Sequence, residues 1–598
     1  MSGLAGGVLT GSSIDTLVSE LSGRANETTW EYEDDAVGLG VVSPSADPAG
    51  VTVWTDGDRA GVVYGAVTNR DELDYGDDER LFERLLADPV ATAEAMEGEF
   101  LTVAYDSEPD RIVVVTDKLG SRSCYHITEG PFRFATSVGA LTELLADPTL
   151  DEQGVSNLLL MGKMWGQRTL VEEVSMQRPA TVLEVVDGER TTTRYWRPNY
   201  DPHPQEAGYF DELADRYRQA ARRVMSTIPY EAGLWLSGGL DSRTTAAALV
   251  EQSPGTDFDL RAYGYDANPP TRDNPRIATA IAERLGIDYT EVPLTAETFG
   301  EDFERVIEVV DGMLQWNTTA NLSPSYHIED TPPVLMEGVQ GGLIGDHLLR
   351  YHFDESRSVV ETQYASEATA SAATVTGLLN ADVDPMAPFE AEAAATPETT
   401  HRGQVLDTHF QNYYARSGLE SNRLMRDSTG SRTMQVDGDY LAWCARLPTY
   451  YRKGTFPLSQ HVFTSDAGGI PYGTSIAKLE LCRRISPALA KVPYERTKLA
   501  PEKPYHLHVA GFVGNVLYSR LRQKPTYANG QLQDFWIRDE DTALSGYVRD
   551  LIDDATDRSL FDADAVSDLY ADHMRGANNV SMIARVTTVE KWIQDHLE

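Results

Sequence analysis

GLWLSGGLDSRTTAAALV, residues 233–250, says more about the fold of this chain than any other stretch. An apolar strand ends at Leu236, and the turn Ser237–Gly239 follows it. Asp241 and Ser242 then stand at the start of a helix. The stretch therefore predicts a strand, a glycine-rich turn and a helix in direct succession.

The residue types of this turn suit a phosphate ligand. Glycines let the backbone turn sharply and come close to a ligand. The free N–H groups and the dipole of a helix start favour a phosphate or pyrophosphate, and the carboxylate of Asp241 suits Mg²⁺. The turn is neither a Walker A loop nor GxGxxG. A tight strand–helix turn with Asp or Ser as the helix N-cap stays an alternative.

Strands and helices alternate around this stretch. Residues 207–226 have helical spacing, and 258–266 reads as a strand that a helix at 276–286 follows. Such alternation predicts a parallel α/β sheet. Residues 405–598 read as mainly helical. Residues 355–402, rich in Ala, Thr and Glu, read as an acidic insertion that is either partly helical or mobile.

The N-terminal third has a different pattern. Short β-rich runs such as EFLTVAYD (99–106) are broken by Gly, Asp and Pro. YWRPNYDPHP (195–204) is typical of a linker. A chain of 598 residues is too long for one core. We therefore predict one domain at 1–195 and a second at 205–598.

The composition limits the partners of the chain. There are 93 acidic and 51 basic residues, a net charge of −42, and only nine lysines. This balance argues against a nucleic-acid partner and is typical of a salt-rich cytoplasm, such as that of a halophilic archaeon. The three cysteines form no CxxC, so we expect neither a zinc site nor a disulfide. With no leader or membrane-spanning run, we expect a cytoplasmic protein without a membrane partner.

SGGLDS (237–242) resembles the pyrophosphate loop of the ATP pyrophosphatase superfamily, and with its surroundings it resembles the asparagine synthetase family. Residues 119–145, 168–185 and 431–448 are also similar to segments of that family. The resemblance implies an α+β sandwich of the N-terminal-nucleophile type. It implies that an α/β parallel-sheet ATP pyrophosphatase domain with helical C-terminal additions follows.

The resemblance also implies a reaction and its cofactors. The second domain would bind ATP and Mg²⁺, adenylate a carboxylate and release pyrophosphate, after which an amine would displace AMP to form an amide. Asp241 would hold Mg²⁺ and be essential for catalysis. Leu236 and Tyr263 would flank the adenosine, although both fit equally well as sheet core. The other nucleotide-binding residues would be Ser237, Gly238, Gly239, Ser242 and Gly338.

The sequence departs from the family at a second loop, residues 336–350. Gly341 and Gly342 stand where the family has an Asp-Glu pair that helps to bind Mg²⁺ and substrate. Asp346 either substitutes as a metal ligand or caps a helix. This departure puts the usual substrate and the metal count in doubt.

Lysines are scarce in the second domain, with none between Lys163 and Lys453. Any catalytic lysine must be Lys453, Lys478, Lys491 or Lys498, and each of them also fits as a surface charge. We take Lys453 as the candidate.

The opening MSGLAGG resembles the family start Met-Cys-Gly-Ile-Ala-Gly, with Ser2 in place of the nucleophilic cysteine. The family arginine that clamps glutamine is missing from GVVSPS (40–45), and Ala66 replaces a pocket Glu. Only Asp77 remains of the expected pocket charges. We interpret Ser2 as the relic of a nucleophile in a degenerate class II glutamine amidotransferase domain.

Three functions stay open. The leading one is an AMP-forming carbon–nitrogen ligase that takes ammonia or an amine without hydrolysing glutamine. Its substrate would be a small-molecule or peptide carboxylate, and the sequence leaves a homodimer open. The second is a cyclase that closes an amide within one molecule. The third is a pseudoenzyme that binds nucleotide without chemistry, which Gly341 and Gly342 favour and the intact SGGLDS opposes.

Overall fold

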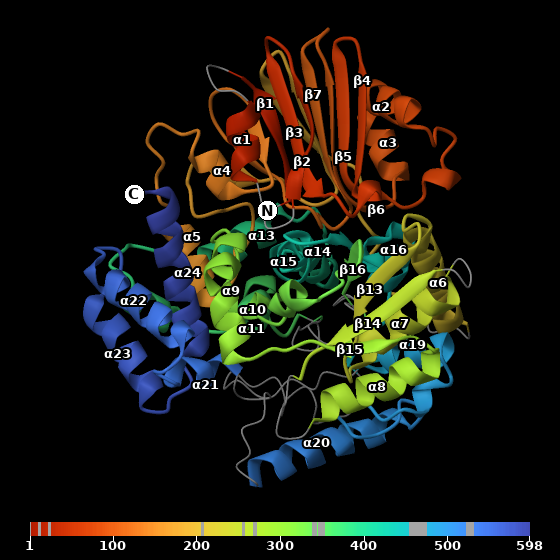
Figure 1. Cartoon of the computed structure of the whole chain (residues 1–598), viewed down its shortest axis with the longest axis vertical. Coiled ribbons are helices and arrows are strands. Elements are labelled where there is room, and N and C mark those ends of the chain that lie inside the picture. The colour runs from red at the N-terminus through yellow and green to blue at the C-terminus, as the bar shows by residue number, and fades with distance from the viewer. Residues whose placement is uncertain are drawn as a thin grey trace.

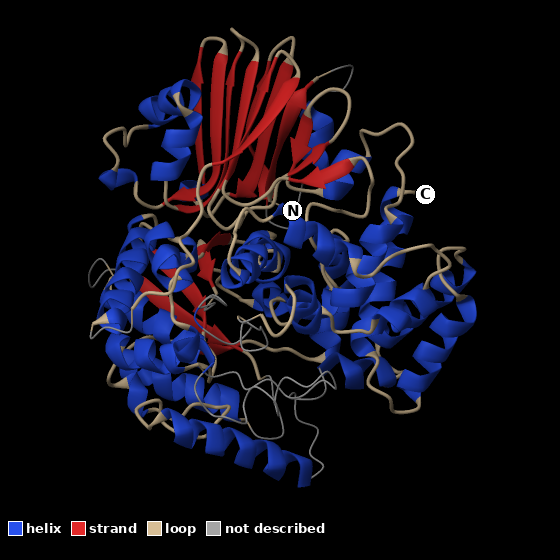
Figure 2. Ribbon diagram, turned by 180° about the vertical axis from the view of Figure 1, so that it is seen from behind, coloured by secondary structure: helices blue, strands red, loops and turns tan. Residues whose placement is uncertain are grey.

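The computed structural model describes most of the chain and builds it around three sheets (Figures 1 and 2). Two sheets of six strands each are antiparallel, and one sheet of five strands is parallel. The sheets and the helical C-terminal region confirm the expected combination of α+β and α/β parts. The described residues are 2–9, 14–21, 26–204, 208–253, 258–266, 272–337, 344, 353, 355–453, 475–521 and 532–598.

The two antiparallel sheets share one core. Leu4 and Val41 of the first sheet and Leu101 and Val114 of the second belong to the same buried apolar cluster. Helices α1 and α4 cover the outer face of the first sheet, and α2 and α3 cover that of the second (Figure 1). The first sheet, in order, consists of β10 (Val174–Met176), β8 (Tyr125–Ile127), β9 (Arg133–Ala135), β1 (Gly3–Val8), β3 (Val37–Pro44) and β2 (Asn26–Glu33). The second consists of β12 (Glu189–Arg194), β11 (Thr181–Val186), β7 (Arg111–Thr116), β6 (Gly98–Asp106), β5 (Arg59–Val67) and β4 (Val51–Asp56). The helices are α1 (Ile14–Glu20), α2 (Asp78–Ala87), α3 (Pro89–Ala95), α4 (Val138–Thr142) and α5 (Glu152–Met161).

The parallel sheet has β13, the strand before the serine–glycine turn, in the middle. Its order is β15 (Tyr289–Glu291), β14 (Asp259–Gly264), β13 (Glu231–Trp235), β16 (Val334–Met336) and β17 (Gly430–Arg432). Ligands of such sheets bind outside the carboxyl ends of the strands. The segment after β13 therefore lies where a ligand is expected. The helices packed around this sheet include α6 (Tyr209–Ser226), α7 (Leu240–Glu251), α8 (Asp273–Leu285), α16 (Gly438–Ala445) and α19 (Ile476–Ile485).

The acidic insertion is helical and packed, so the mobile alternative is wrong. Val375 and Phe389 are fully buried among residues of other segments. Glu367 is ion-paired with Lys163 of the N-terminal part at 2.6 Å. Buried apolar side chains and this buried ion pair fix the segment in place. Its helices are α11 (Val359–Glu367), α12 (Ala372–Leu378) and α13 (Ala387–Ala395). The remaining helices are α9 (Ala296–Val309), α10 (Trp316–Thr319), α14 (His401–Tyr413), α15 (Arg423–Arg426), α17 (Thr449–Lys453), α20 (Tyr505–Leu521), α21 (Leu532–Arg538), α22 (Ala543–Asp557), α23 (Ala563–Met574) and α24 (Val580–His596).

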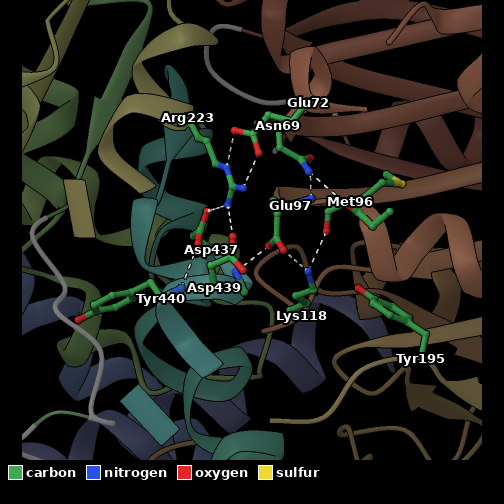
Figure 3. Close-up of polar contacts among 12 residues, drawn as sticks. Asn69, Glu72, Met96, Glu97, Lys118, Tyr195, Arg223, Asp437, Asp439 and Tyr440 are labelled. Atoms are coloured by element: carbon green, nitrogen blue, oxygen red, sulfur yellow. Dashed lines mark hydrogen bonds and ion pairs between the residues drawn. The ribbon is translucent and has the colours of Figure 1, made fainter. Parts of the chain in front are cut away.

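Charged side chains join the antiparallel sheets to the parallel-sheet part (Figure 3). Glu97, next to β6, is ion-paired with Lys118 and accepts a hydrogen bond from the backbone N–H of Gly438 at 2.6 Å. Arg223 of α6 binds Glu72 at 2.5 Å and Asp437 at 2.6 Å. The two parts are therefore linked by a partly buried ionic junction rather than by a flexible tether.

No helix in the described part of the chain is long and apolar enough to cross a membrane.

Candidate functional site

The turn after β13 is closed by its own serines. The Oγ atoms of Ser237 and Ser242 lie 2.9 Å apart, and the Ser237 N–H donates to Ser242 Oγ at 3.0 Å. The Gly239 N–H donates to Ser237 Oγ at 3.2 Å, and Gly239 is the N-cap of α7. The first N–H groups of a helix have no partner within it. The loop therefore presents backbone donors at the centre of the sheet edge, as an anion site requires.

A side chain at Gly238 would be crowded by Glu495. A Cβ atom there would meet the Glu495 carboxylate at 3.0 Å. The Gly238 N–H donates to Asn274 Oδ1 at 2.6 Å, and Asn274 in turn donates to the carbonyl of Tyr265 at 2.9 Å. The turn is thus held on one side by α8 and on the other by the segment that carries Glu495.

Asp241 is the charged side chain of the loop, and a lysine accompanies it. Lys478 Nζ lies 2.6 Å from Asp241 Oδ2 and is almost completely buried on α19. Lys498 is half-exposed and pairs with Asp273 at 2.8 Å. The side chain of Lys453 lies outside the described residues. Of the four candidate lysines, the structure brings Lys478 to the loop.

Further carboxyl groups gather at the same sheet edge. Glu337 directly follows β16, and burial raises its pKa to about 7. Burial also raises the pKa of Glu495. The pKa of Tyr265 rises to about 12 mainly through burial, with contributions from both Glu337 and Glu495. In the described part of the chain, no three His, Cys, Asp or Glu side chains form a metal-binding group.

The remaining predicted nucleotide contacts divide into two sets. Leu236 and Tyr263 are buried in apolar clusters at the sheet, and the Leu236 N–H donates to the Tyr263 carbonyl at 2.7 Å. This burial favours the sheet-core alternative for both side chains. Four residues of the second loop lie outside the described residues, namely Gly338, Gly341, Gly342 and Asp346.

The surroundings of Ser2 are filled by the protein itself. Ser2 Oγ lies 2.8 Å from the hydroxyl of Tyr64, and both residues are buried. The Arg122 guanidinium lies over the Tyr64 ring, 4.3 Å from its centre. Arg122 is also 3.3 Å from Glu99, which accepts a hydrogen bond from Ser431 of β17 at 2.8 Å. A continuous set of side chains thus runs from Ser2 to the parallel sheet.

Asp77 caps helix α2. Its carboxylate accepts the Arg80 N–H at 2.9 Å as the N-cap of α2, and the side chain is 57% exposed. Ala66, by contrast, is buried on β5. The structure therefore gives Asp77 a helix-capping role, and its part in a glutamine pocket stays a prediction.

Comparison with known proteins assigns both parts of the chain. Residues 74–196 match the glutamine amidotransferase domain, and residues 212–439 match the asparagine synthase domain. The chain has the two-domain architecture of the asparagine synthetase family. The asparagine synthase match spans the parallel sheet and the loop after β13. It supports an ATP-dependent, amide-forming ligase in general terms.

Two individual proteins are also similar in part. An enzyme named amidase chry2 from Gibberella zeae is 24% identical over 226 residues, which are 35% of this chain. The match spans about a third of the length of that relative, 33%. The solved structure of glutamine phosphoribosylpyrophosphate amidotransferase from B. subtilis, complexed with ADP and GMP, covers 49% of this chain and 82% of its own. Its TM-score of 0.23 at 11% identity is too low to define a fold.

Several groups of this asparagine synthetase-family site were not singled out from the sequence. The sequence left four lysines as candidates, because no local pattern marks Lys478. Its partner Asp241 lies 237 residues earlier in the chain. Asn274 and Glu495 are far from the loop in sequence, and only the tertiary fold brings them into contact with it. Arg243 had a visible signal, since a cation in the first turn of a helix opposes the helix dipole.

Proposed function

We propose that the chain is an ATP-dependent ligase that adenylates a carboxylate, releases pyrophosphate and forms an amide without hydrolysing glutamine. The observation that carries the proposal is the loop at the end of the central strand β13. Hydrogen bonds between Ser237 and Ser242 hold this loop, and the ion pair of Asp241 with Lys478 lies beside it. Matches to both domains of the asparagine synthetase family support it.

The loop supports binding of the β- and γ-phosphates. Backbone N–H donors at a helix start bind phosphate oxygens without any side chain. The Lys478 ammonium adds a positive charge beside them, 2.6 Å from Asp241. Aimed donors of this kind stabilise the charge that develops as pyrophosphate leaves.

The donor set of the loop fits Mg²⁺. Asp241 offers a hard carboxylate oxygen and would hold the ion, which would neutralise charge on the polyphosphate. Lys478 already neutralises Asp241 in this structure. We propose that Lys478 turns to the phosphates when the ion binds, because the carboxylate then serves the metal.

Glu337 is suited to move a proton during amide formation. An amine attacks a carbonyl only as the free base and loses a proton as the amide forms. A base with a pKa near the working pH does this most effectively, and burial raises the pKa of Glu337 to about 7. We propose that Glu337 accepts this proton.

The absence of glutamine hydrolysis rests on the region around Ser2. The Tyr64 ring and the Arg122 guanidinium occupy the space beside the Ser2 hydroxyl. No arginine lies in residues 40–45 to bind a glutamine carboxylate. The nitrogen would therefore come from free ammonia or from an amine, which also keeps intramolecular cyclisation open as a second function.

The test is a ligation assay with the full chain. Carboxylic acids are screened for acid-dependent exchange of labelled pyrophosphate into ATP, in 2 M KCl with Mg²⁺. The active acid is then supplied with ammonium, with glutamine, or with neither. The proposal expects exchange without any amine and an amide with ammonium only. An acid that carries its own amine and cyclises without ammonium would establish the second function. Amide formation with glutamine alone would overturn the account of Ser2.

A further inference from the structure

Arg243 is a buried cation on the inner side of the serine–glycine loop. Its side chain is 0% exposed in the first turns of α7. It donates to the carbonyls of Gly239 at 2.7 Å and Gly238 at 3.0 Å. It also donates to the carbonyls of Val492 at 2.7 Å and Pro493 at 3.0 Å. The guanidinium therefore ties the loop to the segment that leads to Glu495.

Arg243 forms no ion pair in the described part of the chain, and the Glu495 carboxylate attracts its charge only from a distance. Among the described residues, no carboxylate lies within ion-pair distance of its guanidinium, and all its hydrogen-bond partners are main-chain carbonyls. Burial lowers the pKa of Arg243. A cation in the first turns of a helix also faces the positive end of the helix dipole. The protein thus holds a positive charge at an unfavourable place, directly behind the loop.

The same hydrogen bonds fix the direction of the loop amides. In a trans peptide the C=O and the following N–H point in opposite directions. Because Arg243 holds the carbonyls of Gly238 and Gly239, the N–H groups of Gly239 and Leu240 must point to the other side, where the Gly239 N–H donates to Ser237 Oγ at 3.2 Å. Hydrogen bonding at a carbonyl also polarises the N–H of the same peptide. One side chain therefore aims and strengthens donors that it does not itself carry.

We propose that Arg243 is the positioning residue of the pyrophosphate loop, and that the polyphosphate of the bound nucleotide supplies the negative charge that its guanidinium lacks. This inference rests on the proposed function, since it takes the loop to be the pyrophosphate site. It predicts that Arg243 contributes to affinity for ligands with a pyrophosphate group and little to affinity for the rest of the nucleotide.

The test compares inorganic pyrophosphate with AMP as probes, each titrated with Mg²⁺ into the full chain by calorimetry. Arg243→Met should weaken pyrophosphate binding by about 10- to 100-fold, as expected for lost charge-assisted hydrogen bonds. AMP binding should stay within about threefold. Arg243→Lys keeps the charge, but an ammonium group cannot donate to several carbonyls in the planar geometry of a guanidinium. Its pyrophosphate affinity should therefore lie between those of the wild type and Arg243→Met.

Arg585 provides a matched control. It is also buried, and its guanidinium donates to the Leu159 carbonyl at 2.7 Å and to Gln315 Oε1 at 2.6 Å, on α24. Arg585→Met should lower the melting temperature as Arg243→Met does, yet leave the affinity for pyrophosphate unchanged.

Three results would overturn the inference. The first is equal losses of pyrophosphate and AMP affinity in the Arg243 variants. The second is the same pyrophosphate loss in Arg585→Met. The third is wild-type pyrophosphate affinity in Arg243→Met or, if that variant does not fold, in Arg243→Lys. If the wild type itself binds neither ATP nor pyrophosphate, the proposed function fails and the inference falls with it.

Discussion

Ser2 shows how one residue can keep its place in a fold after its environment has changed. Its hydroxyl lies 2.8 Å from that of Tyr64, and Arg122 covers the Tyr64 ring. Although burial opposes ionisation, Arg122 and Arg426 hold the pKa of Glu99 below its usual value. The network beside Ser2 is therefore a set of paired buried charges, and removing one partner of such a pair costs several kcal/mol.

Ser2→Cys should not produce a glutaminase. The nucleophile would return, but residues 40–45 would still lack an arginine and Ala66 would still stand in place of a pocket Glu. We expect glutamate release from glutamine to stay at the background level in the wild type and in Ser2→Cys. Hydrolysis by the wild type that Ser2→Ala abolishes would show that Ser2 is an active nucleophile.

Glu337 should give amide formation a pH dependence. A base with a pKa of about 7 is mostly protonated at pH 6 and mostly free at pH 8. We expect the rate of amide formation at saturating substrate to rise about tenfold over this interval and then level off. In Glu337→Gln the rate should be low and free of this rise. An unchanged pH profile in Glu337→Gln would show that another group accepts the proton.

The sequence predicted the residues of the loop but not those that support it. Ser237, Gly239 and Asp241 follow from a local pattern of strand, turn and helix. Lys478 and Glu495 reach the loop only through the packing of segments far along the chain, so no local pattern marks them. The capping role of Asp77 was not predicted, because it depends on where α2 begins.

At the scale of elements, the junction between β6 and α16 carries a proton-sensitive charge. Burial raises the pKa of Glu97 to about 7, against the attraction of Lys118. Its value in the unfolded chain is near 4.5. Between these two values the folded state binds the extra proton, so the contribution of Glu97 to stability falls as the pH rises from about 4.5 to 7.

Glu97→Gln should therefore remove part of this pH dependence. Relative to the wild type, we expect the variant to gain on the order of 1–3 kcal/mol between pH 5 and pH 7.5. Thermal unfolding at both pH values measures this difference. Glu72→Gln is the control: a hydrogen bond from Arg223 lowers the pKa of Glu72, so its contribution to stability should not change between pH 5 and pH 7.5. If the two variants change stability in parallel with pH, the assignment to Glu97 is wrong.

The sequence left two alternatives open where its composition was ambiguous, and the helical one is confirmed. Residues 355–402 are rich in Ala and Glu, which suit both a helix and a mobile acidic segment. Their burial depends on partners such as Lys163, which pairs with Glu367 from about 200 positions earlier. The alternation of strands and helices around β13, in contrast, follows from local periodicity and was predicted correctly.

At the scale of the whole molecule, the main feature is the excess of acidic over basic side chains. The net charge is −42 on 598 residues, so the acidic side chains repel one another. Salt screens this repulsion, because the Debye length falls from about 10 Å at 0.1 M salt to about 3 Å at 1 M. We expect the melting temperature to rise by at least about 5 °C between 0.1 M and 1 M KCl as this repulsion is screened. A flat melting temperature over this range would contradict the prediction.

The products of ATP turnover test the central claim of the account most directly. The full chain is incubated with ATP, Mg²⁺ and its carboxylic acid, and the nucleotide and phosphate products are separated and counted. The account predicts AMP and pyrophosphate in equal amounts from the wild type. It predicts none from Asp241→Asn, which removes the metal-binding charge without disturbing the N-cap residue Gly239. ADP with inorganic phosphate from the wild type, or AMP and pyrophosphate at the wild-type rate from Asp241→Asn, would contradict it.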